Sequence, residues 1–186
     1  MKKGKLIVIS GPSGVGKDTI VNEYLKENNA SLSVSATTRK PRENEKHKVH
    51  YYFLTKDEFE EKIKNNEFLE YAKYNDCYYG TLKEEVEGKL EKGIDVILII
   101  EVQGALNIKS RIDDAILIFI MPPSLDELKK RLENRNLDSS LMIENRLKIA
   151  LDEINMKDKY DYIVINENVE AAKNEIKDII NKESIK

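Results

Sequence analysis

The chain has 186 residues and a formal net charge of −3 at pH 7; 40% of its residues are hydrophobic and 35% are charged. This composition is typical of one globular unit, excludes a largely disordered chain and gives no sign of a broad basic face for nucleic acid. The single cysteine, Cys77, excludes an internal disulfide. With no apolar run long enough for a membrane span or a signal peptide, we expect a cytoplasmic protein that binds neither membrane nor nucleic acid.

Four short runs rich in Ile and Val predict the strands of a parallel sheet that is covered on both faces. They lie at residues 6–9, 96–100, 116–121 and 162–165, and each has the length of a strand rather than of a buried helix. Helical periodicity lies between them, and Ser124 with Glu127 forms a capping box at the start of one helix. The alternation predicts an α/β fold, with a parallel sheet flanked by helices.

Residues 33–84 show a different pattern. Short polar and aromatic strands are expected at 51–54 and 68–74, around a helix whose start is marked by Thr55 and Glu58. We therefore expect a small mixed α/β insertion on the sheet.

A glycine-rich segment follows the first predicted strand and precedes the first predicted helix, as a phosphate-binding loop does. It consists of Gly11, Pro12, Ser13, Gly14, Val15, Gly16, Lys17, Asp18 and Thr19. Glycines let backbone N–H groups turn towards phosphate oxygens, and the helix N-terminus favours an anion. Lys17 can place its charge on the β and γ phosphates. An ordinary glycine turn is the simpler alternative, but this spacing in this setting rarely arises by chance, so we expect a nucleoside triphosphate site.

Asp18 stands where many phosphate-binding loops carry a serine or threonine that holds magnesium. The Thr19 hydroxyl could serve instead, or the Asp18 carboxylate could hold the ion directly or through water. Alternatively, Asp18 faces solvent and stabilises the first helical turn, where acidic residues are favoured. The sequence leaves the choice open.

Four later segments carry arginine, tyrosine or glutamate residues that could bind a ligand. Arg39 and Arg42 flank a proline, and arginine suits bidentate contacts with phosphate. The other segments are His50-Tyr51-Tyr52-Phe53, Asn66-Glu67-Phe68-Leu69-Glu70-Tyr71 and Tyr78-Tyr79-Gly80-Thr81. Each alone has a simpler explanation: a solvated basic loop, tyrosines on a half-exposed sheet, or Thr81 and Glu84 as a capping box.

Together, these segments resemble the guanylate kinase family over nearly the whole chain, from the glycine-rich loop to Asn166. The resemblance implies a P-loop kinase core at about 1–32, 85–125 and 155–186, a GMP-binding insertion at about 33–84 and a helical lid at about 126–154. It also implies that the phosphate of GMP is held by Arg39, Arg42, Tyr51 and Tyr79. Guanine would be held or surrounded by Ser35, Glu70, Thr81 and Glu101. Asn166 would lie near the adenine of ATP.

By the same resemblance, Arg131, Arg135 and Arg146 are lid arginines that act with Lys17 on the transferred phosphoryl group, and Mg²⁺ is the cofactor. The simpler explanation for the arginines is a solvated surface or pairing with acids such as Glu127. The chain departs from the family at Ile99, where an acid is often found. Either Ile99 merely packs, or Asp18 compensates for the missing acid at the magnesium site.

We therefore expect transfer of the γ-phosphate of ATP to GMP, and to dGMP, giving ADP and GDP. A carboxylate at Glu70 can accept hydrogen bonds from N1–H and N2–H₂ of guanine, whereas adenine lacks this donor pair and would leave the carboxylate unsatisfied. Two alternatives remain: a related kinase for another small phosphorylated acceptor, and a binding module without catalysis. The intact glycines and Lys17 argue against the second.

Overall fold

The structure, a computed structural model, describes residues 2–74, 76–134 and 140–185. Five parallel strands form its central sheet, in the order β2-β7-β1-β8-β9. They are β1 (Leu6–Ser10), β2 (Ala30–Leu32), β7 (Asp95–Ile99), β8 (Ile116–Met121) and β9 (Tyr162–Ile165). Four of these strands, β1, β7, β8 and β9, lie at the predicted apolar runs and confirm that those runs form strands. The sequence did not indicate β2, a half-buried edge strand of three residues.

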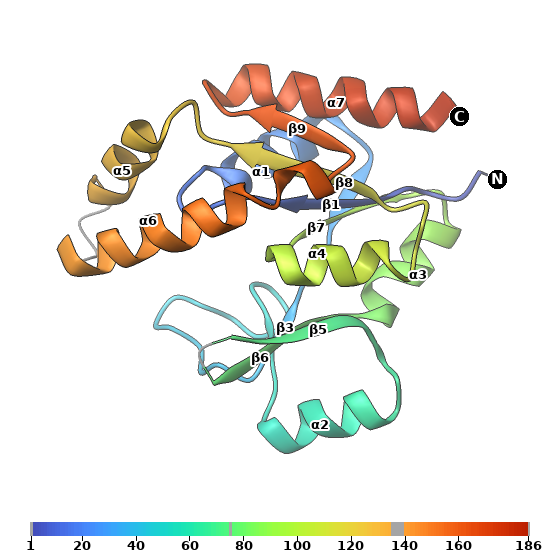
Figure 1. The fold of residues 1–186 in the computed structure, drawn as a ribbon. Helices are drawn as coiled ribbons and strands as arrows, with labels where there is room; N and C mark the ends of the chain where they lie inside the picture. The colour runs from blue at the N-terminus through green and yellow to red at the C-terminus, as the bar shows by residue number, and fades with distance from the viewer. Residues whose placement is uncertain (1, 75, 135–139, 186) are drawn as a thin grey trace.

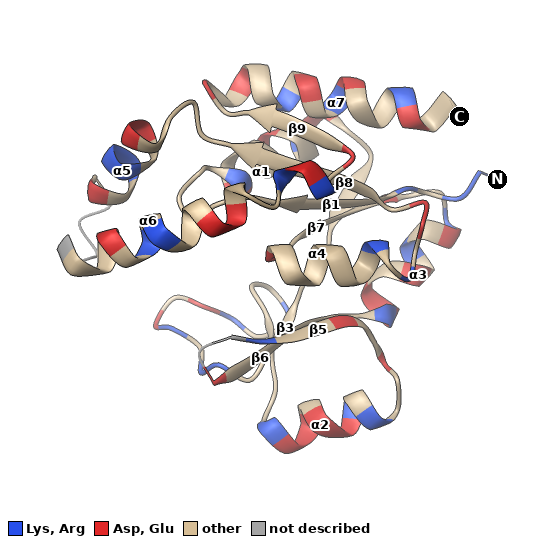
Figure 2. Cartoon of the chain, in the orientation of Figure 1, with Lys and Arg blue, Asp and Glu red and all other residues tan. Residues whose placement is uncertain are grey.

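Helices cover both faces of the central sheet (Figure 1). On one face, α1 (Lys17–Glu27) and α7 (Val169–Ile185) share a hydrophobic cluster with inward-facing residues of the strands. On the other face, α3 (Lys83–Glu91) and α4 (Val102–Lys109) share a second cluster with the alternate residues. The strands β1, β8 and β9 carry no charged residue (Figure 2), as expected for a sheet that is covered on both faces. The predicted α/β fold is confirmed.

A second sheet lies below the central one in Figure 1. Its order is β4-β3-β6-β5, and its strands are β3 (Ala36–Thr37), β4 (Tyr52–Phe53), β5 (Phe68–Tyr74) and β6 (Cys77–Leu82). The helix α2 (Lys56–Lys64) begins at the predicted capping box, in which Thr55 and Glu58 bond each other's backbone N–H. Phe59 of α2 stacks on Phe68 and joins the helix to this sheet.

Two further helices, α5 (Leu125–Glu133) and α6 (Ser140–Ile154), lie together at one side of the central sheet (Figure 1). The Ser124 hydroxyl accepts from the Glu127 N–H at 3.1 Å, which confirms the predicted start of α5. Leu128 and Leu132 pack against Ile143 and Ala150 of α6. A short 3₁₀ turn (Lys157–Lys159) leads on to β9. The exact limits of the core, the insertion and the lid stay a prediction.

Within the described ranges, none of the helices combines the length and the apolar character needed to cross a membrane.

Candidate active site

The phosphate loop (residues 11–19) joins β1 to α1 at the carboxyl end of the central sheet. Gly11 and Gly16 have φ angles of +148° and +100°, where residues with a Cβ are strained. A Cβ on Gly11 would lie 2.3 Å from the carbonyl oxygen of Ile120, and one on Gly16 would lie 2.7 Å from Nδ2 of Asn166. Both glycines are therefore required by conformation and by close approach to β8 and to the end of β9.

The charged and hydroxyl residues of the phosphate loop point in different directions. The Lys17 ammonium donates to the carbonyl oxygens of Gly11 at 2.5 Å and Pro12 at 3.1 Å, so its charge lies over the loop. Asp18 is exposed in the first turn of α1, and its charge acts on Tyr51 in the second sheet. Thr19 lines a cavity beside the loop, together with Gly14, Val15 and Gly16.

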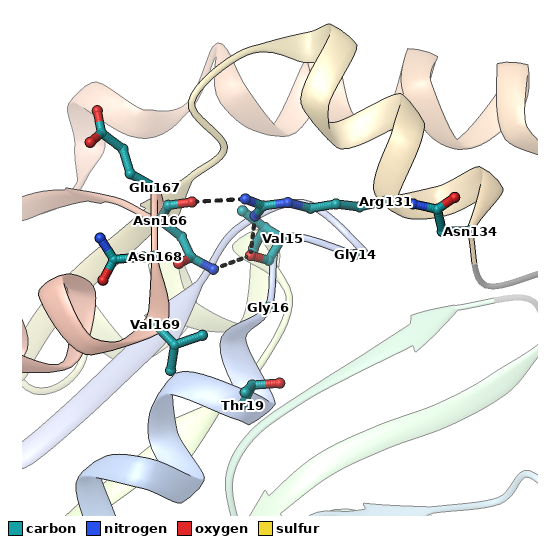
Figure 3. Close-up of a pocket in the computed structure, with 10 residues that line it drawn as sticks. All are labelled: Gly14, Val15, Gly16, Thr19, Arg131, Asn134, Asn166, Glu167, Asn168 and Val169. Carbon is teal, nitrogen blue, oxygen red and sulfur yellow. Dashed lines mark hydrogen bonds between the residues drawn. The ribbon is translucent and has the colours of Figure 1, made fainter.

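This cavity has a volume of about 380 Å³, within the usual size range of small-molecule sites. It lies between the phosphate loop, α5 and the start of α7 (Figure 3). Its lining consists of Gly14, Val15, Gly16, Thr19, Arg131, Asn134, Asn166, Glu167, Asn168 and Val169. The segments that meet here are more than 100 residues apart in the chain, as the Arg131–Val15 contact shows.

Arg131 and Asn166 both bind the backbone of the phosphate loop. The guanidinium of Arg131 donates to the carbonyl oxygens of Val15 at 3.3 Å and Asn166 at 3.1 Å (Figure 3). Asn166 donates from Nδ2 to Val15 at 2.7 Å, and its Oδ1 is buried without a hydrogen-bond partner among the described residues. Arg131 also forms an ion pair with Glu127 at 3.3 Å, as the simpler explanation of pairing with neighbouring acids expected. That explanation does not account for its two bonds to carbonyl oxygens.

The other two predicted lid arginines are placed differently. Arg146 is half-buried on α6. Arg135 lies outside the described residues.

Arg39, Tyr51 and Tyr79 come together in the second sheet. The Arg39 guanidinium lies 5.4 Å from the centre of the Tyr51 ring, and the Tyr51 and Tyr79 rings are 6.3 Å apart. Burial raises the pKa of the Tyr51 hydroxyl, so this group stays neutral and can donate a hydrogen bond. The group forms because β3 pairs with β6, which sets Thr37 opposite Tyr79.

Glu45, which the sequence analysis did not single out, links the two predicted phosphate-binding arginines. Its carboxylate forms a bidentate pair with Arg39, both bonds being 2.9 Å long, and accepts from the backbone N–H of Arg42 at 2.8 Å. The bond from Arg39 lowers the pKa of Glu45 to about 2. Glu45 therefore fixes the Arg39 side chain and the Arg42 backbone, while the Arg42 residue as a whole is exposed.

Glu70 is a buried carboxyl on β5, 4% exposed. The Thr81 hydroxyl donates to its Oε1 at 2.9 Å, and a Cβ on Gly104 of α4 would lie only 2.8 Å from its Oε2. Burial raises the pKa of Glu70, and the bond from Thr81 opposes that rise. The absence of a side chain at Gly104 thus lets α4 approach one oxygen of a largely desolvated carboxyl group closely.

Thr81 is not a helix cap. The helix α3 begins at Lys83 after Leu82 and has no side-chain cap bond, so the alternative of a Thr81–Glu84 capping box is wrong. The reason is that β6 continues to Leu82, which commits the Thr81 side chain to the sheet and to Glu70.

The two other residues expected around guanine, Ser35 and Glu101, immediately precede β3 and α4. The Ser35 carbonyl oxygen accepts from the Tyr52 N–H at 2.8 Å, where β3 meets β4. Glu101 precedes α4 at the end of β7. Burial, and after it the Glu101 carboxyl group, raise the pKa of Glu153 on α6 to about 8. Ile99 packs against the cluster that underlies α1 and α7, as the simpler alternative for this position expected.

Comparison with known proteins identifies the family. The guanylate kinase family model matches residues 3–183. Guanylate kinase of Clostridium tetani is 51% identical over 98% of this chain and 88% of its own length, and that of Bacillus subtilis is 48% identical over 100% and 92%. The crystal structure of guanylate kinase from Anaplasma phagocytophilum superposes with a TM-score of 0.82 at 34% identity, covering 100% of this chain and 88% of that one. The chain belongs to the guanylate kinase family.

Proposed function

We propose that this chain transfers the γ-phosphate of ATP to GMP, and to dGMP, giving ADP and GDP. Family membership supports this reaction, and the observation that carries the choice of acceptor is the buried Glu70 carboxyl beside Gly104. With one oxygen bonded to Thr81, the carboxylate still has lone pairs for the N1–H and N2–H₂ donors of guanine. AMP offers no such donor pair, so binding it would leave a desolvated carboxyl unsatisfied.

The GMP phosphate would bind at the cluster of Arg39, Tyr51 and Tyr79. A guanidinium fixed by Glu45, the neutral Tyr51 hydroxyl and the Tyr79 hydroxyl together offer several donors to an anion. Arg42 would add a second guanidinium from the same loop. Ser35 and Glu101 would surround the base at the ends of β3 and β7.

ATP would bind with its phosphates on the loop of residues 11–19 and its adenine in the cavity of Figure 3. The buried Oδ1 of Asn166 is an acceptor without a partner among the described residues. The 6-amino group of adenine is a donor that would satisfy it, whereas guanine presents an acceptor at that position. This chemistry favours ATP over GTP as the phosphoryl donor.

Mg²⁺ would bind beside the ATP phosphates, held by the Asp18 carboxylate or the Thr19 hydroxyl. The donor chemistry fits, because protein-bound Mg²⁺ keeps several waters and takes one or two protein oxygens together with substrate phosphates. When bound, the ion neutralises charge on the β and γ phosphates. Asp18→Ser and Thr19→Val separate the two roles: the variant that needs more Mg²⁺ for half-maximal activity identifies the ligand, and an unchanged requirement in one variant excludes that residue.

The protein residues would act by alignment and charge neutralisation rather than by forming a covalent bond. A GMP phosphate oxygen would attack the γ-phosphorus in line with the bond to the leaving ADP oxygen. Lys17, Arg131, Arg135 and Arg146 would neutralise the charge on the transferred group, and closure of the lid would exclude water.

Phosphorus NMR of a mixture of ATP, Mg²⁺, GMP and the protein tests this function. We expect the resonances of GDP and ADP to grow together, and Lys17→Met to suppress them. ATP binding without turnover would instead show a binding module, and ADP formation that does not depend on GMP would show a different acceptor.

A further inference from the structure

The strand β5 contains a bulge beside the residue expected to recognise guanine. Over most of its length the strand pairs residue by residue with β6, and Glu70 lies opposite Thr81. The register then shifts by one residue, so that Phe68 lies opposite Leu82. Leu69 is therefore an extra residue in β5, and such an insertion bends the strand and re-aims the side chains beside it.

The bulge turns two consecutive side chains towards the same helix. In a regular strand, neighbouring side chains point to opposite faces of the sheet. Here Leu69 is buried in the hydrophobic cluster that includes α4, and the next residue, Glu70, approaches Gly104 of that helix. Phe68 stacks instead on Phe59 of α2. In Figure 1, α4 lies between the central sheet and β5, and α2 lies on the far side of the second sheet. The bulge thus presents both an apolar anchor and the Glu70 carboxyl group to α4.

Arg111, which follows the end of α4, binds the backbone of this bulge. Its guanidinium donates from Nη1 to the carbonyl oxygen of Leu69 at 3.1 Å. That oxygen belongs to the peptide group between Leu69 and Glu70, so the bond restrains the backbone from which the Glu70 side chain projects. The backbone N–H of Arg111 donates in turn to the carbonyl oxygen of Ile108 in α4, at 2.9 Å. Arg111 therefore ties the bulge to the same helix that Glu70 approaches.

The charge of Arg111 also acts on Glu70. Burial raises the pKa of Glu70, and the bonds from Thr81 and the charge of Arg111 oppose that rise. The opposition favours the ionised carboxylate, which only accepts hydrogen bonds and so suits the two donors of guanine. The simpler explanation for Arg111 is a solvated surface side chain, and its exposure agrees with that. That explanation does not account for its bond to a strand whose bulged residue is buried.

We propose that Arg111 is a positioning residue for guanine recognition, whose bond to the Leu69 carbonyl oxygen holds the bulge in the form that turns Glu70 towards α4. Arg111 does not touch the substrate in this role and acts through Glu70. When the bond is removed, β5 is free to return towards regular alternation, in which Leu69 and Glu70 cannot both face α4. The kinetic consequence rests on the proposed recognition of GMP by Glu70, whereas the structural consequence does not.

NMR of the ligand-free protein tests the contact without any substrate. Arg111→Met keeps the apolar part of the side chain and removes the donor. We expect the ¹³C resonance of the Leu69 carbonyl to move upfield as its hydrogen bond is lost, and the nuclear Overhauser contact between the Glu70 side chain and the Hα protons of Gly104 to weaken. The matched control is Lys109→Met, because Lys109 bonds residues just before β8 and β9 and should change neither signal. Unchanged signals in Arg111→Met would overturn the proposal.

Steady-state kinetics test the effect on recognition. Arg111→Met should raise KM for GMP about tenfold, while kcat and KM for ATP stay close to those of the unaltered protein. Arg111→Lys keeps a charged donor and should restore most of the loss. Lys109→Met should leave KM for GMP unchanged. A KM for GMP that Arg111→Met leaves unchanged, or a fall in kcat alone, would refute the positioning role.

A double-mutant cycle shows whether Arg111 acts through Glu70. In a Glu70→Gln background, Arg111→Met should raise KM for GMP by less than about twofold, because the group that it positions is already impaired. An effect of the same size in both backgrounds would show that Arg111 acts elsewhere and would overturn the proposal. A protein without GMP kinase activity would refute the proposed function, and the NMR comparison would still test the bulge.

Discussion

Replacement of Glu70 by glutamine should separate recognition of GMP from stability of the fold. The change keeps the size of the side chain but replaces one carboxylate oxygen with an NH₂ group, which cannot accept from guanine. A hydrogen bond to a charged group contributes about 1.5–3 kcal/mol. At about 1.4 kcal/mol per tenfold change, kcat/KM for GMP should fall roughly 10- to 150-fold.

The same variant should be at least as stable as the unaltered protein. Burial raises the pKa of Glu70, so the folded chain binds this proton more readily than the unfolded chain does. Stability that depends on the proton is then lost as the pH rises through the folded-state pKa, and neutral glutamine avoids that loss. We therefore expect the melting temperature of Glu70→Gln at pH 7 to be equal or higher.

Steady-state assays with GMP and AMP, combined with calorimetry, test this reasoning. The preference for GMP over AMP should shrink while the fold remains intact. Thr81→Val provides a matched comparison, since it removes the donor to Oε1 without changing the carboxyl group. An unchanged preference in Glu70→Gln would refute the assignment of Glu70 to guanine, and a lower melting temperature would refute the electrostatic argument.

Three other substitutions give separate tests. Glu45→Gln should raise KM for GMP about tenfold by releasing Arg39. Because the pKa of Glu45 is lowered to about 2, this variant should also lose less stability than the unaltered protein as the pH falls from about 5 to 2. Glu43→Gln, at an exposed position, is the control. Asn166→Ala should reduce the preference for ATP over GTP roughly tenfold in donor assays, and an unchanged ratio would argue against a contact with adenine. Arg131→Ala should lower kcat about 100-fold or more with little change in KM for GMP. The control Lys130→Ala, at an exposed position, should leave kcat unchanged. A kcat of Arg131→Ala equal to that of the unaltered protein would exclude a role of Arg131 in the transition state.

Four strands of the central sheet were predictable because they are continuous apolar runs, and such runs need no knowledge of distant contacts. The short edge strand β2 has no such run and was missed. The helix starts at Thr55 and Ser124 were predictable for a similar reason, since the N-cap side chain accepts from a backbone N–H only three residues later. The same local rule failed at Thr81. There, pairing of β6 with β5 commits the side chain to Glu70, and no pattern within a few residues reveals that pairing.

The candidate site shows the same limit. The phosphate loop is one continuous segment, so its composition and its position after a strand were enough to predict it. Glu45 was missed, because its partners Arg39 and Arg42 lie in the same irregular loop, where no helix or strand periodicity relates the three residues.

A coupled assay of ADP release with GMP, AMP, UMP and dTMP as acceptors tests the central claim most directly. We expect ADP formation with GMP at a kcat/KM at least about 100-fold above that for each of the others, because a site built to hydrogen-bond a substrate strongly rejects analogues that lack its donors. Comparable turnover of AMP, or no acceptor-dependent release of ADP, would contradict the account.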